Sequence, residues 1–463
     1  MSEPAGPGRS LPEAAPASVH ARRARWIVPL VLLCVFAAKA VGVYIERDRR
    51  DYWRWHAAAE WSLAGKPLVA EAGGPAPPGA PAYEPWYKLP PAFAVLISPL
   101  GLLPYEAYVL IWYALSLTAA VVGLLLYFRL VTGRYWPEDP CVLLPPVVLI
   151  AGLVWEELHN GQQHLLILAM LAFAAWASWR KWLWCIPAGL AVGLAISIKA
   201  FPAPLVLFLA LLRRWRVALW GLAGVAVWTL LVPGAVRGLE RNWRETTEWY
   251  GRIVNPYVTG QEGRTWEARA FYAVNQSAYA GLHRLLRPVD AIEPPPGEPA
   301  QRANLANLSR GQVDVVFLGW CVAVVLAVAA AGLWHGPADS SAAVGVDFAL
   351  ACLAMLALTP LAWDYFYTAW LPAMVVAAWW ARQAPAGLER HLCVASLALT
   401  APALVALLIP PARAYSPLMW LNLLYLAAMI AVRHSLAGKQ AGCHGRVGRG
   451  LSARQGVCRG GGG

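Results

Sequence analysis

Long runs of apolar residues, separated by short clusters of charged residues, make up most of the chain from residue 26 onward. About 20 apolar residues in helical form are needed to cross the roughly 30 Å hydrocarbon core of a bilayer. The pattern therefore predicts about 12 transmembrane helices, over residues 26–45, 105–128, 141–158, 164–179, 185–198, 201–212, 217–236, 312–334, 345–361, 365–381, 391–409 and 416–432.

Some of these segments are less regular than the others. The runs 185–198 and 201–212 are short for a full crossing, so they are tilted, shielded by neighbouring helices, or enter from one face only. Residues 90–103 form a further apolar stretch that Pro99 interrupts, and we interpret it as re-entrant or interfacial. The run 26–45 resembles the core of a signal peptide, but its length and the spans that follow favour a retained anchor.

The composition agrees with a membrane protein. Of 463 residues, 59% are hydrophobic and only 14% are charged, whereas a soluble domain is typically about 45–50% apolar and about 25% charged. We therefore expect an all-α integral membrane protein, with one helical domain over residues 26–432. Residues 1–25, rich in Ala, Pro and Arg, and the basic, Gly-rich residues 433–463 are expected to be disordered tails.

Basic residues in the short loops predict the orientation of the helices. Arg180-Lys181 and the cluster Arg213-Arg214-Trp215-Arg216 mark one side of the membrane, whereas the opposing loop 158–164 has no Lys or Arg. This asymmetry predicts a multi-pass protein of the cell membrane with both termini in the cytoplasm. Two long segments then lie outside, 46–90 and 237–311.

Charge and cysteine content exclude several other classes of protein. The formal net charge is +12, but the basic residues are spread over loops and both tails and form no patch typical of nucleic-acid binding. Most of the eight cysteines lie within apolar runs and act there as small hydrophobic residues. The sequence has no metalloprotease, P-loop, serine-hydrolase or calcium-loop motif. We therefore predict no cofactor and assign no residue to a metal.

Residues 51–65 carry aromatic and apolar residues at helical spacing and end at Gly65, which predicts an amphipathic helix along the membrane surface. Asp51 opens this segment on the predicted outer face. A carboxylate in this position can act as a general base toward a hydroxyl group. The alternative is an ordinary helix N-cap, because Asp is favoured at that position.

Other polar residues gather on the same predicted face, where ionisable groups are costly and often functional. The run 156–164 contains Asn160 and Gln162 and is either part of a site or a tight turn at Asn-Gly. Lys199 lies between two short apolar runs. It either binds a phosphate as a point charge or extends its ammonium group to the membrane surface.

Two later segments raise the same choice between a site and a structural role. Arginines flank Asn275-Gln276-Ser277, and with Lys199 they form either a cationic site for a lipid phosphate or a solvated basic loop; they are Arg269, Arg284 and Arg287. Asn275 also opens a glycosylation sequon. Trp363-Asp364 is either part of the site or an anchor at the membrane edge.

Taken together and in order, these motifs resemble glycosyltransferase family 87, the polyprenol-phosphate-mannose-dependent α-mannosyltransferases of the GT-C superfamily. The resemblance covers about residues 26–430. The matching stretches are Asp51-Tyr52 with Gly65-Lys66-Pro67; Tyr83-Glu84-Pro85-Trp86-Tyr87-Lys88-Leu89-Pro90-Pro91 leading to Pro99-Leu100-Gly101-Leu102-Leu103-Pro104; Asn160-Gly161-Gln162; Gly193-Leu194-Ala195-Ile196-Ser197-Ile198-Lys199-Ala200-Phe201-Pro202 before Arg213-Arg214; Asn275-Gln276-Ser277 with Arg284; and Thr359-Pro360-Leu361-Ala362-Trp363-Asp364.

The resemblance implies a GT-C-type helical bundle whose active site faces away from the cytoplasm. It implies inverting transfer of a hexose, mannose in this family, from a polyprenyl-phosphate donor to a hydroxyl group of a lipid or glycan acceptor. Asp51 occupies the position of the acidic base. Lys199, Arg269 and Arg284 are then candidates for binding the donor phosphate. Candidates for contacting the substrates are Tyr87, Asn160, Gln162, Asn275, Gln276, Trp363 and Asp364.

The chain departs from the family pattern at one position. Family members often carry His just after the late Trp-Asp, whereas Tyr365 and Phe366 stand there in this chain. This difference argues against a His-mediated role and for a different acceptor. A transporter or flippase for a lipid-linked or small solute is the alternative function, although such proteins typically contain inverted repeats and we find no repeat. An inactive relative that acts as a scaffold is a third interpretation.

Overall fold

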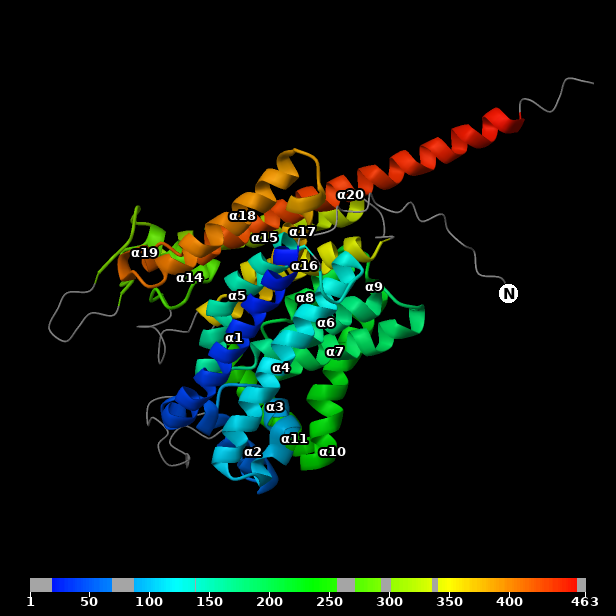
Figure 1. Cartoon of the computed structure of the whole chain (residues 1–463). Helices are drawn as coiled ribbons and strands as arrows, with labels where there is room; N and C mark the ends of the chain where they lie inside the picture. Colours follow the sequence, from blue (N-terminus) through cyan, green and yellow to red (C-terminus); the bar gives the residue numbers. More distant parts are fainter. Residues whose placement is uncertain are drawn as a thin grey trace, which may run out of the picture.

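The computed structural model describes residues 19–68, 87–137, 139–255, 271–292, 301–334 and 340–455. These residues form a bundle of helices (Figure 1), and no strand occurs among them apart from one isolated bridge between Ile292 and Gln301. The all-α prediction is therefore confirmed.

Within the described residues, eight helical segments are long and apolar enough to cross a membrane. All eight coincide with predicted spans. They are α1 (Val19–Glu46), α4 (Tyr105–Thr132), α5 (Pro140–Asn160), the continuous helix of α9 (Trp215–Ala226), the π-helical turn Val227–Leu231 and α10 (Val232–Arg237), then α15 (Arg310–Trp334), α16 (Ser341–Leu358), α18 (Leu388–Ala406) and α20 (Pro417–Gln455).

The remaining four predicted spans form shorter helices. They are α6 (His164–Ser178), α7 (Cys185–Ile198), α8 (Pro204–Leu211) and α17 (Leu371–Gln383). None reaches the ~20 residues that a full crossing needs, so the count of twelve transmembrane helices is not confirmed. Most residues of α17 are buried by other helices, which is how a short apolar helix avoids exposing its ends to lipid.

The remaining helices are short connecting elements. The apolar stretch 90–103 is interrupted near Pro99. Helix α3 (Pro91–Ile97) ends two residues before it, and Pro99 lies in the short 3-10 helix Ser98–Leu102 that follows. The predicted amphipathic segment forms α2 (Tyr52–Leu63), and Gly65 follows it with a positive φ of 65°. The others are the 3-10 turns Arg47–Arg49, Trp182–Trp184 and Asp364–Trp370, the π-helical turn Tyr250–Val254, and α11 (Leu239–Trp249), α14 (Ala278–Leu286) and α19 (Pro410–Ala414).

Glycines allow α7 and α9 to pack in backbone contact. A Cβ atom added to Gly193 would lie 2.4 Å from the backbone carbon of Gly224, and one added to Gly189 would lie 2.3 Å from Cβ of Trp220. Small residues that bring helix backbones together are a typical packing device inside membranes, where no hydrophobic effect drives helices to associate. This contact fixes the end of α7, from which Lys199 projects.

Helix α16 lies at the centre of the bundle and carries a buried charge. Asp347 has no exposed surface, and its two carboxylate oxygens accept from Arg214 at 2.9 Å and Arg433 at 2.8 Å. The ion cluster therefore joins α16 to α20 and to the loop before α9. A charge buried in this way requires such partners, because an unpaired one would cost several kcal/mol.

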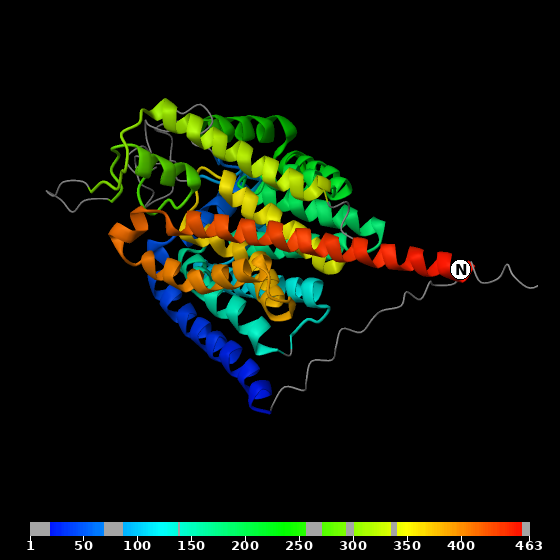
Figure 2. The ribbon, with the colours of Figure 1, turned by 90° about the horizontal axis from the view of Figure 1, so that it is seen from above.

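Helix α20 extends well beyond the other helices (Figures 1 and 2). Its backbone is helical to Gln455, past the predicted end of the membrane domain at residue 432. The predicted disordered tail over 433–463 is therefore partly helical, and residues 456–463 and 1–18 lie outside the described part of the chain.

Candidate active site

Three loops far apart in the sequence bring Asp51, Gln162 and Lys199 into one hydrogen-bonded chain. The side-chain amide of Gln162 donates from Nε2 to Oδ2 of Asp51 at 2.5 Å. Its Oε1 accepts from Nζ of Lys199 at 3.3 Å. Asp51 precedes α2, Gln162 lies in the turn between α5 and α6, and Lys199 lies in the break between α7 and α8. A carboxylate and an ammonium group thus flank one neutral amide.

The carboxylate of Asp51 lies between this cluster and Arg54 of its own helix, and it does not cap the backbone of that helix. Asp51 is the N-cap residue of α2, but within the described structure its side chain makes no capping hydrogen bond. Its other oxygen, Oδ1, lies 3.0 Å from the guanidinium of Arg54, and 29% of the Asp51 side chain remains exposed. The N-cap alternative therefore does not explain why the carboxylate points toward Gln162.

The turn that carries Gln162 depends on Gly161. Gly161 has a φ of 66°, a left-handed conformation that costs glycine little. An added Cβ atom there would lie 2.7 Å from the ring of Tyr52. The Gly161 carbonyl accepts from the indole nitrogens of Trp55 at 2.9 Å and Trp112 at 3.1 Å. Through these two hydrogen bonds, helices α2 and α4 hold the turn in place directly beside Gln162.

A buried carboxylate fixes the other end of the same turn. Glu157 is fully buried and accepts hydrogen bonds from the backbone N–H groups of His164 and Leu165 at the start of α6. It also bonds Nδ1 of His164 at 2.9 Å. A carboxylate at a helix N-terminus satisfies free N–H groups and interacts favourably with the helix dipole. Glu157 therefore positions the turn that holds Gln162.

Lys199 lies over an aromatic face. Its Nζ is 4.5 Å from the ring centre of Phe366 and 5.9 Å from that of Tyr365, close enough for cation–π attraction. Lys199 lies after the last residue of α7, outside the candidate spans. Burial lowers the pKa of its ammonium group to about 8, against the opposing effect of Glu157 and Asp51. A partly desolvated cation of this kind interacts strongly with a phosphate.

Trp363 and Asp364 lie beside this cluster. The rings of Trp363 and Tyr365 are parallel within 5°, with centroids 6.4 Å apart. Asp364 pairs through Oδ2 with Arg413 at 2.5 Å, and both side chains are partly exposed. Burial raises the pKa of the Asp364 carboxyl to about 6, although Arg413 opposes the shift. The motif thus offers an aromatic surface and an ion pair next to Lys199.

The segment Asn275-Gln276-Ser277 holds the loop that leads to Trp363. Asn275 donates to the Pro360 carbonyl at 3.2 Å and accepts from the Ala362 N–H at 3.0 Å. Gln276 donates to the Arg413 carbonyl at 3.0 Å. Asn275 and Gln276 are almost fully buried, so in this fold they support the site from behind. The burial of Asn275 also excludes it as a glycosylation acceptor in the folded protein.

Arg284 does not offer its charge to a ligand in this structure, contrary to the prediction. It is fully buried. Its guanidinium donates to the carbonyls of Phe271, Tyr272 and Ala414 at 2.8–2.9 Å and to the hydroxyl of Ser416. It therefore ties α14 to the loop before α20. The other predicted phosphate ligand, Arg269, lies outside the described residues.

Two predicted substrate contacts are turned away from the cluster. Tyr87 is 2% exposed, and its hydroxyl donates to the Pro90 carbonyl and accepts from the Ala94 N–H at the start of α3. Asn160 donates to the carbonyl of Glu156 in its own helix at 2.8 Å. In this conformation both residues shape local backbone, so we leave them out of the proposed contacts.

The comparison with protein families decides what kind of protein this is. The family model described as "Glycosyltransferase family 87" matches residues 87–360 of the chain. This range is more than half of the chain. The chain belongs to glycosyltransferase family 87. The resemblance inferred from the motifs is confirmed, and the protein is a membrane glycosyltransferase.

Other comparisons add little to the family 87 assignment. A comparison with curated proteins found no match. Among solved structures, the chain is similar to the crystal structure of ArnT from Cupriavidus metallidurans bound to undecaprenyl phosphate. The identity is 16%, the TM-score is 0.34, and the match covers 88% of this chain and 78% of that chain. A likeness at this level carries no argument about residues or substrates.

The sequence did not single out three side chains that shape this candidate site. Glu157 and His164 lie in the polar run 156–164, but nothing in the pattern shows that they pair. Arg413 stands alone in a loop otherwise poor in basic residues, which was its only signal. Among the described residues, no group of three or more His, Cys, Asp or Glu side chains could hold a metal ion.

Proposed function

We propose that this family 87 member transfers a hexose, specifically mannose, from a polyprenyl-phosphate donor to a hydroxyl group of a lipid or glycan acceptor, with inversion. The observation that carries the proposal is the chain of contacts from Asp51 through Gln162 to Lys199. The reaction needs a base for the acceptor hydroxyl and a cation for the leaving phosphate. Asp51 and Lys199 are groups of these two kinds, and the Gln162 amide joins them. The family membership favours this enzyme over a transporter.

Asp51 is the proposed general base. It takes the proton of the acceptor hydroxyl while that oxygen attacks the anomeric carbon of the sugar. The bond from the anomeric carbon to the phosphate oxygen breaks, and the polyprenyl phosphate leaves. Attack opposite to the leaving group inverts the configuration. The exposed part of the Asp51 side chain leaves room for the hydroxyl to reach it.

Lys199 is the proposed partner of the leaving phosphate. Negative charge builds up on that phosphate as the bond breaks, and a preorganised cation in a partly desolvated place stabilises it. The Gln162 amide fixes Lys199 relative to Asp51. Trp363, Asp364 and the nearby Tyr365 and Arg413 are the proposed contacts for sugar rings, because aromatic faces and charged hydrogen-bonding groups suit sugars.

Transfer by purified protein tests the proposal. Wild-type protein and Asp51→Asn are incubated with radiolabelled polyprenyl-phosphate mannose and membrane lipid and glycan fractions, and labelled products are identified. We expect the Asp51→Asn rate to fall by ~10²-fold or more, the usual contribution of a positioned base, with an unchanged melting temperature. Glu60→Gln is the control, since Glu60 is an exposed residue of the same helix. Undiminished turnover in Asp51→Asn would move the base elsewhere, with Asp364 as the next candidate.

A further inference from the structure

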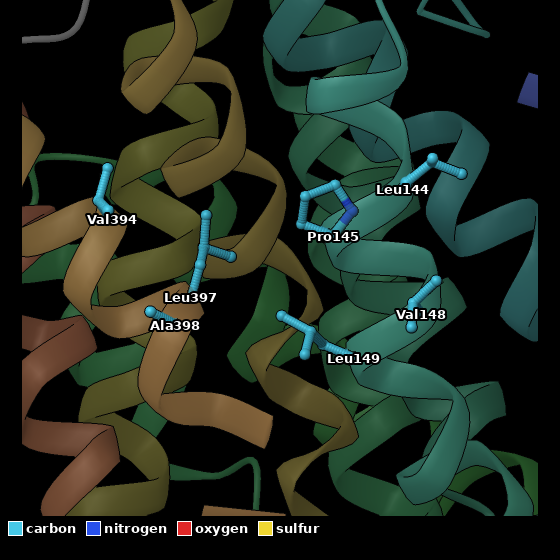
Figure 3. Close-up of a pocket in the computed structure, with 7 residues that line it drawn as sticks. All are labelled: Leu144, Pro145, Val148, Leu149, Val394, Leu397 and Ala398. Atoms are coloured by element: carbon cyan, nitrogen blue, oxygen red, sulfur yellow. The ribbon is translucent and has the colours of Figure 1, made fainter. Parts of the chain in front are cut away.

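An apolar groove runs between α5 and α18 on the lipid-facing side of the bundle. It has a volume of about 480 Å³. Figure 3 shows side chains of the two helices lining it from either side, with further helices behind. The lining residues are all apolar: Leu144, Pro145, Val148, Leu149, Val394, Leu397 and Ala398. A groove without polar groups suits a hydrocarbon chain and offers nothing to a sugar or a phosphate.

The groove shares a helix with the active site. The turn that carries Gln162 follows directly after Asn160, the last residue of α5. Between the groove and that end lies Gly152, which is exposed, and an added Cβ there would meet no described atom within 4 Å. Gly152 therefore places no side chain between the groove and the next turn of α5, where Lys39 of α1 covers the ring of Trp155.

The depth of the groove limits what can fill it. Leu149 and Leu144 precede Asn160 by 11 and 16 residues, which places them about 16 and 24 Å from the site end of α5 at 1.5 Å per residue. One leaflet is only about 15 Å deep, half of the hydrocarbon core. An ordinary acyl chain with its headgroup at the site end stops near the midplane, whereas a polyprenyl chain of roughly ten isoprene units continues past it.

We propose that the groove between α5 and α18 binds the distal isoprene units of the lipid donor, in the half of the bilayer remote from the transfer site. This inference rests on the proposed function, because it takes the donor phosphate to lie at Lys199. The charges agree with this placement. The cation lies at the site end, and the groove itself is uncharged, so one amphiphile matches both. The groove makes the enzyme selective for long polyprenyl chains.

Donor chain length and groove-filling variants test the proposal together. Ala398→Trp and Val148→Trp fill the groove from either side. Leu399→Trp is the matched control, because Leu399 is exposed on the same helix and does not line the groove. Each protein is assayed with mannosyl phosphates that carry a chain of about ten or about two isoprene units.

We expect wild-type protein and Leu399→Trp to have the lower KM for the long-chain donor. In both groove variants that KM should rise roughly tenfold, the effect of losing about ten van der Waals contacts between the chain and the groove, while the short-chain KM stays unchanged. Native mass spectrometry should show the same loss for sugar-free long-chain polyprenyl phosphate.

Unchanged chain-length preference and binding in both groove variants would overturn the proposal. If the variants lose only co-purified phospholipid, the occupant is a lipid of the remote leaflet. If their oligomeric state changes instead, it is a second copy of the chain. Failure of the wild-type protein to transfer from either donor would count against the proposed function, while the binding of sugar-free polyprenyl phosphate would still decide the groove.

Discussion

Asp51 accepts a 2.5 Å hydrogen bond from Gln162, which is 111 positions later in the sequence. One carboxylate oxygen thus bonds Gln162, while the other pairs with Arg54 of α2. Because the same amide accepts from Lys199, the spacing between the carboxylate and the ammonium group is set by one side chain. The proposed base and the proposed phosphate ligand therefore depend on a residue that carries no charge.

Replacing Gln162 tests that dependence. Gln162→Met keeps the length of the side chain and removes both hydrogen bonds. We expect a loss of roughly 10–10²-fold in kcat/KM, because misplacing catalytic groups by about 1 Å can cost that much. The measurement is transfer by purified protein with the donor below its KM.

Gln163→Met is the matched control for this change. Gln163 is adjacent and fully buried, yet among the described residues its amide has no hydrogen-bond partner. Replacing an unpaired buried amide with an apolar side chain should leave stability unchanged or raise it. Equal loss of activity in both variants would mean that the turn is sensitive to any substitution, and that the contacts of Gln162 are not special.

The lowered pKa of Lys199 predicts how the use of the donor depends on pH. Its pKa is lowered to about 8 because burial disfavours the charged form. The ammonium group is therefore present below about pH 8 and lost as the pH rises through that value. We expect kcat/KM for the donor, which reports the free enzyme, to fall on the alkaline side.

Lys199→Arg provides the comparison for the pH profile. A guanidinium keeps its proton far above the pKa of a lysine, so the alkaline fall should move to higher pH, even if the rate is reduced overall. An alkaline limb at the same pH in both proteins would assign the titration to another group. The variant is informative only when it still binds the donor, which the binding of polyprenyl phosphate establishes.

The sequence predicted the helices better than the contacts of the site. Apolar runs mark where the chain meets lipid, so the ends of α7 agree with the predicted span 185–198. The roles of single polar residues depend on which loop each one meets. Lys199 and Arg284 are both cations near predicted outer loops, but one remains partly exposed and the other is fully buried. Nothing local to either residue distinguishes them.

The difference in burial between Lys199 and Arg284 predicts that removing each charge affects a different property of the protein. Lys199→Gln should raise the donor KM with little change in melting temperature, because the side chain serves a ligand. Arg284→Gln should lower the melting temperature, since it leaves several buried carbonyl groups without donors, each at a cost of about 1–3 kcal/mol. A raised donor KM in a stably folded Arg284→Gln would return Arg284 to the phosphate site.

The packing of α7 on α9 predicts an indirect effect on the same site. A Cβ atom at Gly193 would lie 2.4 Å from the backbone of Gly224, and backbone cannot rotate away as a side chain can. Gly193→Ala should therefore push the helices apart and destabilise the protein by about 1–3 kcal/mol, the usual cost of overpacking. Because Lys199 directly follows α7, the donor KM should rise as well. Gly319→Ala is the control, since its new Cβ would meet no described atom within 4 Å and alanine favours a helix by roughly 0.5–1 kcal/mol. Thermal unfolding in one detergent compares the two variants, and equal melting temperatures would show that the α7–α9 contact is looser than the structure indicates.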